Sequence, residues 1–373
     1  MNFRKDHWLA KREAPPLPAP ISLSPSREFD GNDGPWSSFP IHIGTPPQAV
    51  KVLISTASSQ TWAVLPEGCT QSDPANCSTA RGGFFQPTTS TTWKQNQDVF
   101  GGFSPLLLEA NLGEDGTGLY GYDTVSLGGQ GTNGTTLDQQ VVAGITTPGF
   151  YLGLFGLNPQ PVMLPNTTAP LPGFISKLNQ SGLIPSLSWS YTAGNQYRPG
   201  PVYGSVVLGG YDISRFESNE LSFAINDTSS RNLQVNIGTM VLNTNNFTTV
   251  LSTSNESVTA CIDSTTPYIW LPLNLCQQFE EAFGITWDEG VQAYLVNDAL
   301  HSALRDQDTS VVFNIGNSST APGQGLNISL PYAAFDLIAE DPLLKKNSSR
   351  YFPLMRAANE SQYTLGRTFL QEA

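Results

Sequence analysis

The pattern Val52-Leu-Ile-Ser55-Thr-Ala-Ser-Ser-Gln-Thr-Trp62 occurs twice in this chain, the second time as Ala260-Cys-Ile-Asp263-Ser-Thr-Thr-Pro-Tyr-Ile-Trp270. In each copy an apolar strand leads into a loop rich in serine and threonine, and a tryptophan follows seven residues after the first residue of the loop. A second pair of motifs, Gly153-Leu-Phe-Gly156 and Thr364-Leu-Gly366, comes later in each half. Two matches in the same order, roughly 200 residues apart, predict a duplicated β lobe.

The composition favours carboxylate chemistry over other kinds of catalysis. The 373 residues include 31 Asp and Glu against 18 Lys and Arg, which gives a net charge of −13. Nucleic acid and anionic membranes are poor partners for so acidic a chain. The three histidines, His7, His42 and His301, leave little material for a catalytic triad or a zinc site. We therefore expect no metal site and no cofactor, and we look for acidic side chains.

Runs of β-branched residues between turn signals predict an all-β fold with few short helices. Strands are expected at residues 39–44, 48–54, 122–127, 205–208 and 311–315. A helix is expected at 274–283, because Leu275, Phe279 and Phe283 share one face and Gly284 follows. A shorter helix is expected at 174–179, ahead of Gly182.

Five segments together resemble the pepsin-like aspartic proteases, in particular the secreted and surface members of filamentous fungi. They are Ile43-Gly-Thr-Pro-Pro-Gln48, the loop that ends at Trp62, Gly121-Tyr-Asp-Thr-Val125, Val207-Leu-Gly-Gly-Tyr-Asp212 and Leu365-Gly-Arg-Thr-Phe369. The resemblance covers residues 36–373. It implies two β lobes, at 36–212 and 213–373, with a peptide-binding cleft between them and a disordered leader at 1–35.

In that family each lobe contributes an Asp-Thr/Ser-Gly loop. The two aspartates share one proton, because like charges that lie so close cannot both ionise. Carried over to this chain, the first aspartate falls on Ser55 and the second on Asp263. One carboxylate is therefore absent, and no His or Lys nearby in the sequence could activate Ser55 as a nucleophile. The cleft is expected to be lined by Thr56, Ala57, Ser264, Thr265, Leu112 and Gly113.

Further departures from the family pattern point the same way. Ala57 and Thr265 stand where the family has glycines, and a β-branched threonine resists unusual backbone geometry. The tyrosine of the family's flap should align near Asn111 or Leu112, whereas Tyr120 lies beyond the hairpin tip. These departures predict an inactive pseudopeptidase that keeps a cleft for a peptide or protein ligand. Two alternatives stay open: an active aspartic endopeptidase with an unorthodox site, and a partner-binding or inhibitor module.

The remaining side chains near these loops have simpler interpretations. Asp263 is expected to accept hydrogen bonds inside its own loop, since one carboxylate lacks the partner that handles the second proton. Trp62 and Trp270 are expected in the lobe cores. Glu114 and Asp115 are expected to be solvated residues of the hairpin tip.

Cysteines and sequons indicate a secreted or cell-surface protein. Cys69 and Cys77 suit a small disulfide, and sequential pairing would join Cys261 to Cys276. Four cysteines allow three connectivities, and buried free thiols are the alternative. N-glycosylation is expected at several Asn-x-Ser/Thr sites. These sites are Asn76, Asn133, Asn166, Asn179, Asn226, Asn246, Asn255, Asn317, Asn327, Asn347 and Asn359.

The ends of the chain carry less information. No apolar run approaches the roughly 18 residues that span a bilayer, and residues 1–10 lack the apolar core of a signal peptide. The dibasic pair Lys11-Arg12 is read equally well as a processing site or as incidental. Family members continue past Leu370 through a further strand or two, so an end at Ala373 would leave strand edges open, and we expect an incomplete sequence. We expect an extracellular monomer.

Overall fold

The computed structural model describes most of the chain. The described residues are 16–373 apart from gaps at 97–102, 107–109, 114–115, 129–133, 163, 165–168, 226–230, 254–255, 318–324, 341–342 and 344–347. In this part of the chain no helix is long and apolar enough to cross a membrane.

The N-terminal half forms a mixed sheet whose strand order is β10-β6-β11-β5-β4-β9-β7, with β8 paired to β9. Its strands are β4 (Phe39–Ile43), β5 (Gln48–Ser55), β6 (Thr61–Val64), β7 (Lys94–Gln95), β8 (Phe103–Pro105), β9 (Thr117–Leu127), β10 (Thr136–Ile145) and β11 (Gly153–Gly156). The strand β10 also pairs with β9, which curls the sheet on itself. Short helices lie around this sheet: η1 (Pro66–Gly68), α1 (Cys77–Ala80), η2 (Pro87–Thr89), η4 (Ala110–Leu112) and α2 (Phe174–Gln180).

The C-terminal half repeats this arrangement with the order β21-β20-β14-β16-β25-β17-β24, and β15 pairs with β14. Its strands are β14 (Gln234–Asn243), β15 (Thr248–Ser252), β16 (Val258–Ile262), β17 (Ile269–Pro272), β20 (Ser310–Gly316), β21 (Leu326–Pro331), β24 (Leu354–Ala357) and β25 (Thr364–Leu365). A smaller sheet holds β18 (Thr286–Asp288), β19 (Ala293–Leu295), β22 (Leu337–Ala339) and β23 (Ser349–Phe352). The helical segments are α3 (Leu273–Phe283), α4 (Asp298–Asp306), α5 (Tyr332–Phe335), η6 (Glu360–Gln362) and α6 (Arg367–Leu370).

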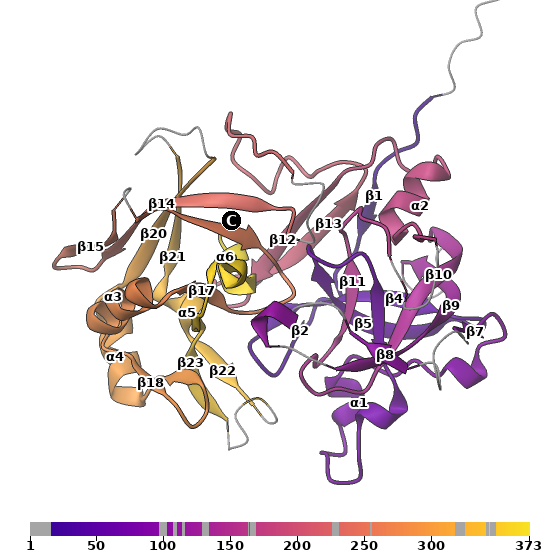
Figure 1. Cartoon of the computed structure of the whole chain (residues 1–373), viewed down its shortest axis with the longest axis horizontal. Coiled ribbons are helices and arrows are strands. Elements are labelled where there is room, and N and C mark those ends of the chain that lie inside the picture. The colour runs from indigo at the N-terminus through magenta and orange to yellow at the C-terminus, as the bar shows by residue number, and fades with distance from the viewer. Residues whose placement is uncertain are drawn as a thin grey trace, which may run out of the picture.

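A third sheet lies between the two halves. It contains β1 (Ile21–Leu23), β13 (Val202–Leu208) and β12 (Trp189–Asn195) in that order, and Figure 1 shows β12 and β13 where the N-terminal lobe, in indigo and magenta, meets the orange and yellow C-terminal lobe. The strands β2 (Phe29–Asp30) and β3 (Trp36–Ser37) pair nearby. The leader expected to be disordered over 1–35 therefore includes ordered strands, because β1 forms antiparallel pairs with β13.

Buried apolar side chains form a core in each half and a further cluster that joins the halves. The C-terminal core is rich in phenylalanine and includes Phe283, Phe335 and Phe352, and a separate aliphatic core fills the N-terminal half. The joining cluster places Trp62 in one group with Tyr351 of the C-terminal half. The lobes are therefore in direct apolar contact as well as being linked by the chain.

Most of the expected elements are confirmed. The expected strands fall within β4, β5, β9, β13 and β20 to within a residue, and the two expected helices are α2 and α3. The helix α3 ends at Gly284, whose φ of 69° is the left-handed conformation that a glycine C-cap supplies. The helix α4 was not expected, although Asn297 accepts a hydrogen bond from Leu300 N as an N-cap should.

One cysteine pairing is confirmed and the other is wrong. Cys69 and Cys77 form a disulfide. Cys261 and Cys276 are buried thiols, and Cys276 Sγ lies 3.4 Å from Leu271 O. The strand β25 lies between β16, which carries Cys261, and β17, whose Leu271 carbonyl contacts Cys276, so a strand separates the two thiols. Burial also raises the pKa of the Cys276 thiol to about 12.

Expected glycosylation sites differ in exposure. Asn76, Asn246, Asn327 and Asn359 are exposed, and Asn179 and Asn317 are half-buried. The remaining sites lie outside the described residues: Asn133, Asn166, Asn226, Asn255 and Asn347.

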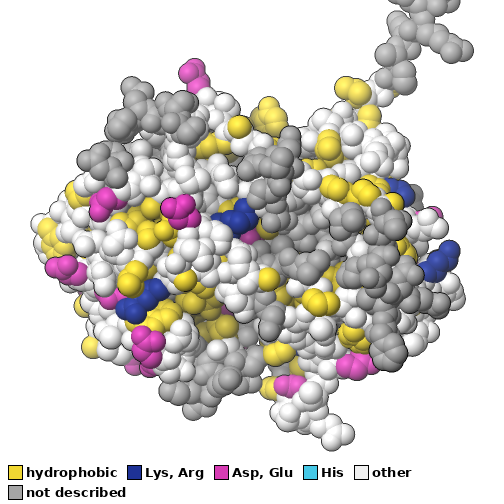
Figure 2. All heavy atoms as spheres, viewed as in Figure 1, with side chains coloured by type: hydrophobic (Ala, Val, Ile, Leu, Met, Phe, Trp, Pro, Cys, Tyr) yellow, Lys and Arg dark blue, Asp and Glu magenta, His cyan; other side chains and the backbone are white. Residues whose placement is uncertain are grey.

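On the face drawn in Figure 2, acidic side chains are scattered singly rather than gathered into one patch.

The phenylalanine core gives a stability prediction. Phe352 is 1% exposed, and its ring stacks on Phe335 with centroids 4.7 Å apart. Replacing Phe352→Ala is expected to lower the free energy of unfolding by about 3–5 kcal/mol, because the apolar contacts are lost and a cavity remains. Urea unfolding measures the change. Phe247→Ala is the matched control, since Phe247 is 50% exposed, and equal effects of the two substitutions would contradict the assigned core.

Candidate active site

The two repeated loops meet at the centre of the molecule and exchange hydrogen bonds. Thr56 N donates to Ser264 Oγ, and Ser264 N donates to Thr56 Oγ1, both at 3.0 Å. The same hydroxyls then donate onward: Ser264 Oγ to Ile54 O at 2.7 Å, and Thr56 Oγ1 to Ile262 O at 3.4 Å. Thr56 and Ser264 are 2% and 0% exposed. This symmetrical exchange fixes the two loops against each other.

The second repeated motif places each loop. β5 runs parallel to β11 with Ser55 opposite Gly156, and β16 runs parallel to β25 with Ile262 opposite Leu365. A Cβ on Gly156 would meet Ser58 O at 2.4 Å, and a Cβ on Gly366 would meet Thr266 O at 2.4 Å. Only glycine therefore allows each loop to fold back so closely over its neighbouring strand.

Ser55 and Thr265 are in direct contact where the lobes meet. Their hydroxyl oxygens are 2.7 Å apart, and Ser58 N donates to Ser55 Oγ at 2.8 Å. Ser55 is 0% exposed and Thr265 is 5% exposed. A separation of 2.7 Å is that of a direct O–H···O bond, so no water lies between these two oxygens. A pair of neutral hydroxyls occupies this buried position.

Asp263 is held within its own loop. Its Oδ1 accepts a hydrogen bond from Thr265 N at 2.8 Å, and the residue is 2% exposed. This is the hydrogen bond within the loop that the sequence analysis expected. Within the part of the chain that the structure describes, no group of three or more His, Cys, Asp and Glu side chains could hold a metal ion.

Arg367 binds the backbone of the second loop, which contains Asp263. Its Nη1 donates to Ser264 O at 3.0 Å and to Thr265 O at 2.6 Å, and its Nη2 donates to Asp33 Oδ2 at 2.6 Å. The guanidinium also stacks over the Trp36 ring, 4.9 Å from its centroid. The other Asp33 oxygen accepts from Trp36 Nε1. The carboxylate that Arg367 links to this loop therefore has both oxygens engaged.

Tyr120, on the strand β9 of the hairpin, contacts the first repeated loop. Tyr120 is 1% exposed and donates to Gln60 Oε1, which also accepts from Trp62 Nε1, both at 3.0 Å. Burial raises the pKa of the Tyr120 phenol. No hydrogen bond between described residues joins Leu112 or Gly113 to either loop.

At the hairpin end, Asn111 bonds across the lobes. Its Nδ2 donates to Ser361 O at 2.7 Å, and its backbone oxygen accepts from Gln362 Nε2 at 2.5 Å. The neighbouring tip residues Glu114 and Asp115 lie outside the described residues.

The structure thus brings together Ser55, Thr56, Asp263, Ser264 and Thr265, which the repeat had singled out. Ala57 lies beside them, and its carbonyl accepts from Asn158 Nδ2 at 2.9 Å. Trp62 and Trp270 are buried, but Trp62 belongs to the cluster that joins the halves and not to the core of one lobe.

Sequence reasoning missed the residues that brace the loops. Gln60 had no role assigned, and neither Asp33 nor Arg367 was singled out. A signal was present for Arg367, because a cation directly after Leu365-Gly366 in an apolar motif must find partners if it is buried.

The chain is similar to known proteins over nearly its whole length. Residues 38–373 match the family model described as eukaryotic aspartyl protease. The chain is 25% identical over 348 residues to secreted aspartic protease 8 of Candida albicans, covering 92% of this chain and 73% of that protein. It is also 25% identical over 347 residues to candidapepsin of Candida tropicalis, covering 92% and 76%.

A solved structure shares the fold. The aspartic proteinase from Irpex lacteus matches with a TM-score of 0.57 at 16% identity, over 95% of this chain and 92% of that one. Both compared chains are therefore two-lobed over nearly their whole length.

The contacts of Arg367 give a second prediction. Arg367→Met is expected to lower the free energy of unfolding by about 3–5 kcal/mol, because it leaves Asp33 as a partly buried charge without its partner and orphans two carbonyls. Adding Asp33→Asn should recover part of the loss, and urea unfolding of the four chains in a double-mutant cycle measures the coupling. Additive effects of the two substitutions would contradict the assigned pair.

Proposed function

Since the chain belongs to the eukaryotic aspartyl protease family, we propose that it is a member without proteolytic activity that binds a peptide or protein segment in the cleft between its lobes. The observation that carries this proposal is the direct contact of the Ser55 and Thr265 hydroxyls. The family's reaction needs one carboxylate to take a proton from water and a second to act on the scissile carbonyl. In this chain Asp263 has a hydroxyl pair where its partner carboxylate would lie.

The rate lost when one catalytic carboxylate is absent supports inactivity. Removing one general acid or base typically costs 10²–10⁴-fold in rate. The 2.7 Å contact also closes the gap between the loops in which a water would have to sit. Asp33, the carboxylate connected to this loop, is bound to Arg367 and Trp36 and so is not available as a substitute.

The scaffold supports retention of binding. The exchange between Thr56 and Ser264 holds both loops in place, and neither Ser55 nor Asp263, at the family's aspartate positions, takes part in it. An extended segment that enters between the lobes on the hairpin side would have to displace the bonds that Asn111 makes with Ser361 and Gln362. These bonds lie between largely exposed groups, where water can replace them at little cost.

Restoring the carboxylate pair tests the proposal. Ser55→Asp combined with Ala57→Gly and Thr265→Gly is expected to give measurable cleavage of an unfolded protein between about pH 3 and pH 6, where such a pair works. The unmodified chain is expected to give none. Product peptides are counted by mass spectrometry. A matched control carries Ser59→Asp with the same two glycines, which adds a carboxylate in the same loop at the wrong position, and it should stay inactive.

Proteolysis by the unmodified chain would contradict the proposal. Cleavage by the unmodified chain that disappears with Asp263→Asn would show an active endopeptidase. In parallel, a peptide mixture is passed over the immobilised full chain, and we expect retained peptides of unchanged length. A protein partner that stays bound while such a peptide saturates the cleft would instead favour a binding or inhibitor module.

We also propose that the chain is extracellular and glycosylated. One relative, from Candida albicans, is a secreted aspartic protease by name, and the Cys69–Cys77 disulfide suits an oxidising compartment. Produced through a eukaryotic secretory pathway, the chain should lose mass when N-glycans are removed enzymatically. Replacing the exposed Asn76, Asn246, Asn327 and Asn359 by Gln should remove more of that mass than replacing the half-buried Asn179 and Asn317. An unchanged mass would contradict glycosylation.

A further inference from the structure

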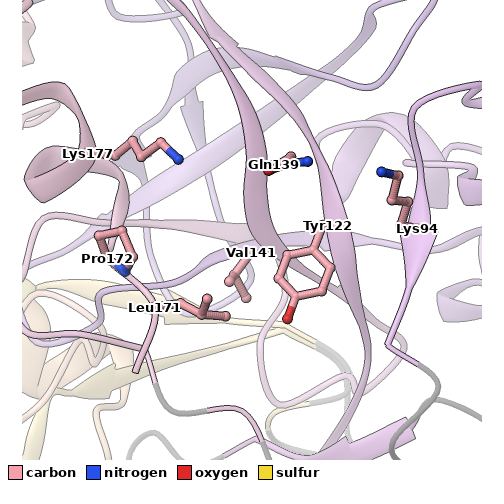
Figure 3. A pocket seen from close by; sticks show the side chains of 7 residues that line it. All are labelled: Lys94, Tyr122, Gln139, Val141, Leu171, Pro172 and Lys177. Atoms are coloured by element: carbon pink, nitrogen blue, oxygen red, sulfur yellow. The ribbon is translucent and has the colours of Figure 1, made fainter. Parts of the chain in front are cut away.

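A pocket of about 260 Å³ lies on the N-terminal lobe, away from the repeated loops. Figure 3 shows that its walls come from β7, β9 and β10, from α2 and from the segment that precedes α2. One side is apolar, formed by Val141, Leu171 and Pro172 beside the ring of Tyr122. The polar side chains are Lys94, Lys177 and Gln139.

The two lysines face each other across this pocket. In Figure 3 the amino group of Lys177 points in from one side and that of Lys94 from the other, both toward Gln139. No ion pair between described residues involves either lysine. Lys51, by contrast, pairs with Glu28 and Asp30 at 2.6 Å each. In a chain with a net charge of −13, two ammonium groups with no described acidic partner at one pocket form a local positive field.

The backbone at Gln139 contributes to this arrangement. Gln139 has a φ of 54°, a left-handed conformation that is uncommon for residues other than glycine. The pairing of β10 with β9 shifts register between Leu137 and Gln140, so Gln139 lies in a bulge. Bulges redirect side chains, and strain of this kind clusters at ligand sites. The bulge places an amide between the two ammonium groups (Figure 3).

We propose that this pocket binds a small organic dianion, a dicarboxylate with a short aliphatic chain. One carboxylate contacts Lys94, the other contacts Lys177, and the aliphatic chain packs on Val141 and Leu171. The volume supports a small ligand, since pockets for drug-sized molecules start at about 300 Å³. Gln139 supplies an amide donor to orient one end. This site is separate from the two loops, so the proposal stands whether or not the chain cleaves peptides.

Binding of adipate, the six-carbon dicarboxylate, to the full chain tests the proposal by calorimetry at low ionic strength and neutral pH. Lys94→Gln and Lys177→Gln are each expected to weaken binding at least about fivefold, because each removes a charge-assisted hydrogen bond. Hexanoate, which has the same chain length and a single carboxylate, should bind more weakly by a similar factor. Added salt should weaken adipate binding further.

Arg305→Gln is the matched control, because it removes one positive charge from an exposed site in the C-terminal lobe and should leave adipate binding unchanged. Adipate binding that neither lysine substitution weakens would overturn the proposal, as would no binding at millimolar concentrations. A Glu-Ala-Glu peptide is the further arm: if it binds through both lysines while adipate does not, the site belongs to an acidic protein segment and the dicarboxylate proposal is wrong.

Discussion

The hydrogen bonds exchanged between Thr56 and Ser264 hold the two lobes together at their centre. Both side chains are buried, and each satisfies a backbone N–H of the opposite loop. Losing either hydroxyl would leave the other loop with a buried orphan donor, and each such group costs about 1–3 kcal/mol. The close turns at Gly156 and Gly366 serve the same end, because they bring the loops into reach of each other. The contact between the two loops therefore depends on Thr, Ser and Gly positions.

The residues that join the loops are not the residues at the family's catalytic positions, so a substitution at a catalytic position can leave the fold intact. Ser55 and Asp263 each lie next to a member of the exchange without belonging to it. Two buried carboxylates side by side repel each other and raise the cost of ionisation, whereas a neutral hydroxyl pair carries no such cost. Where the family resemblance implies an acid and a glycine, this chain has Ser55 and Thr265, whose hydroxyls form a satisfied hydrogen bond. Sites built for catalysis commonly sacrifice stability, and relaxing them restores it.

Local sequence patterns were enough to predict most of the fold and part of the candidate site. The repeat around Ser55 and Asp263 predicted the strands and a duplicated lobe, because strand periodicity and turn residues act over a few positions. The meeting of the two loops was implied by the family resemblance. Contacts between distant residues left no such trace: the Asp33–Arg367 pair joins positions 334 residues apart. The expected Cys261–Cys276 bond failed for the same reason, since the intervening strand β25 comes from the far end of the chain. Cleft-lining roles for Leu112 and Gly113 rest on the family resemblance alone.

The contacts between the lobes differ in strength, and this difference decides where a cleft could open. The exchange at Thr56 is buried. Exposing the apolar cluster that contains Trp62 and Tyr351 to water would cost roughly 25 cal/mol for each Å² of apolar surface. The Asn111 bonds lie between largely exposed groups and contribute about 0.5–1.5 kcal/mol each after exchange with water. Thermal fluctuation can break the last contact while the first two persist. An entering segment would therefore separate the hairpin from η6 and leave the rest of the interface in place.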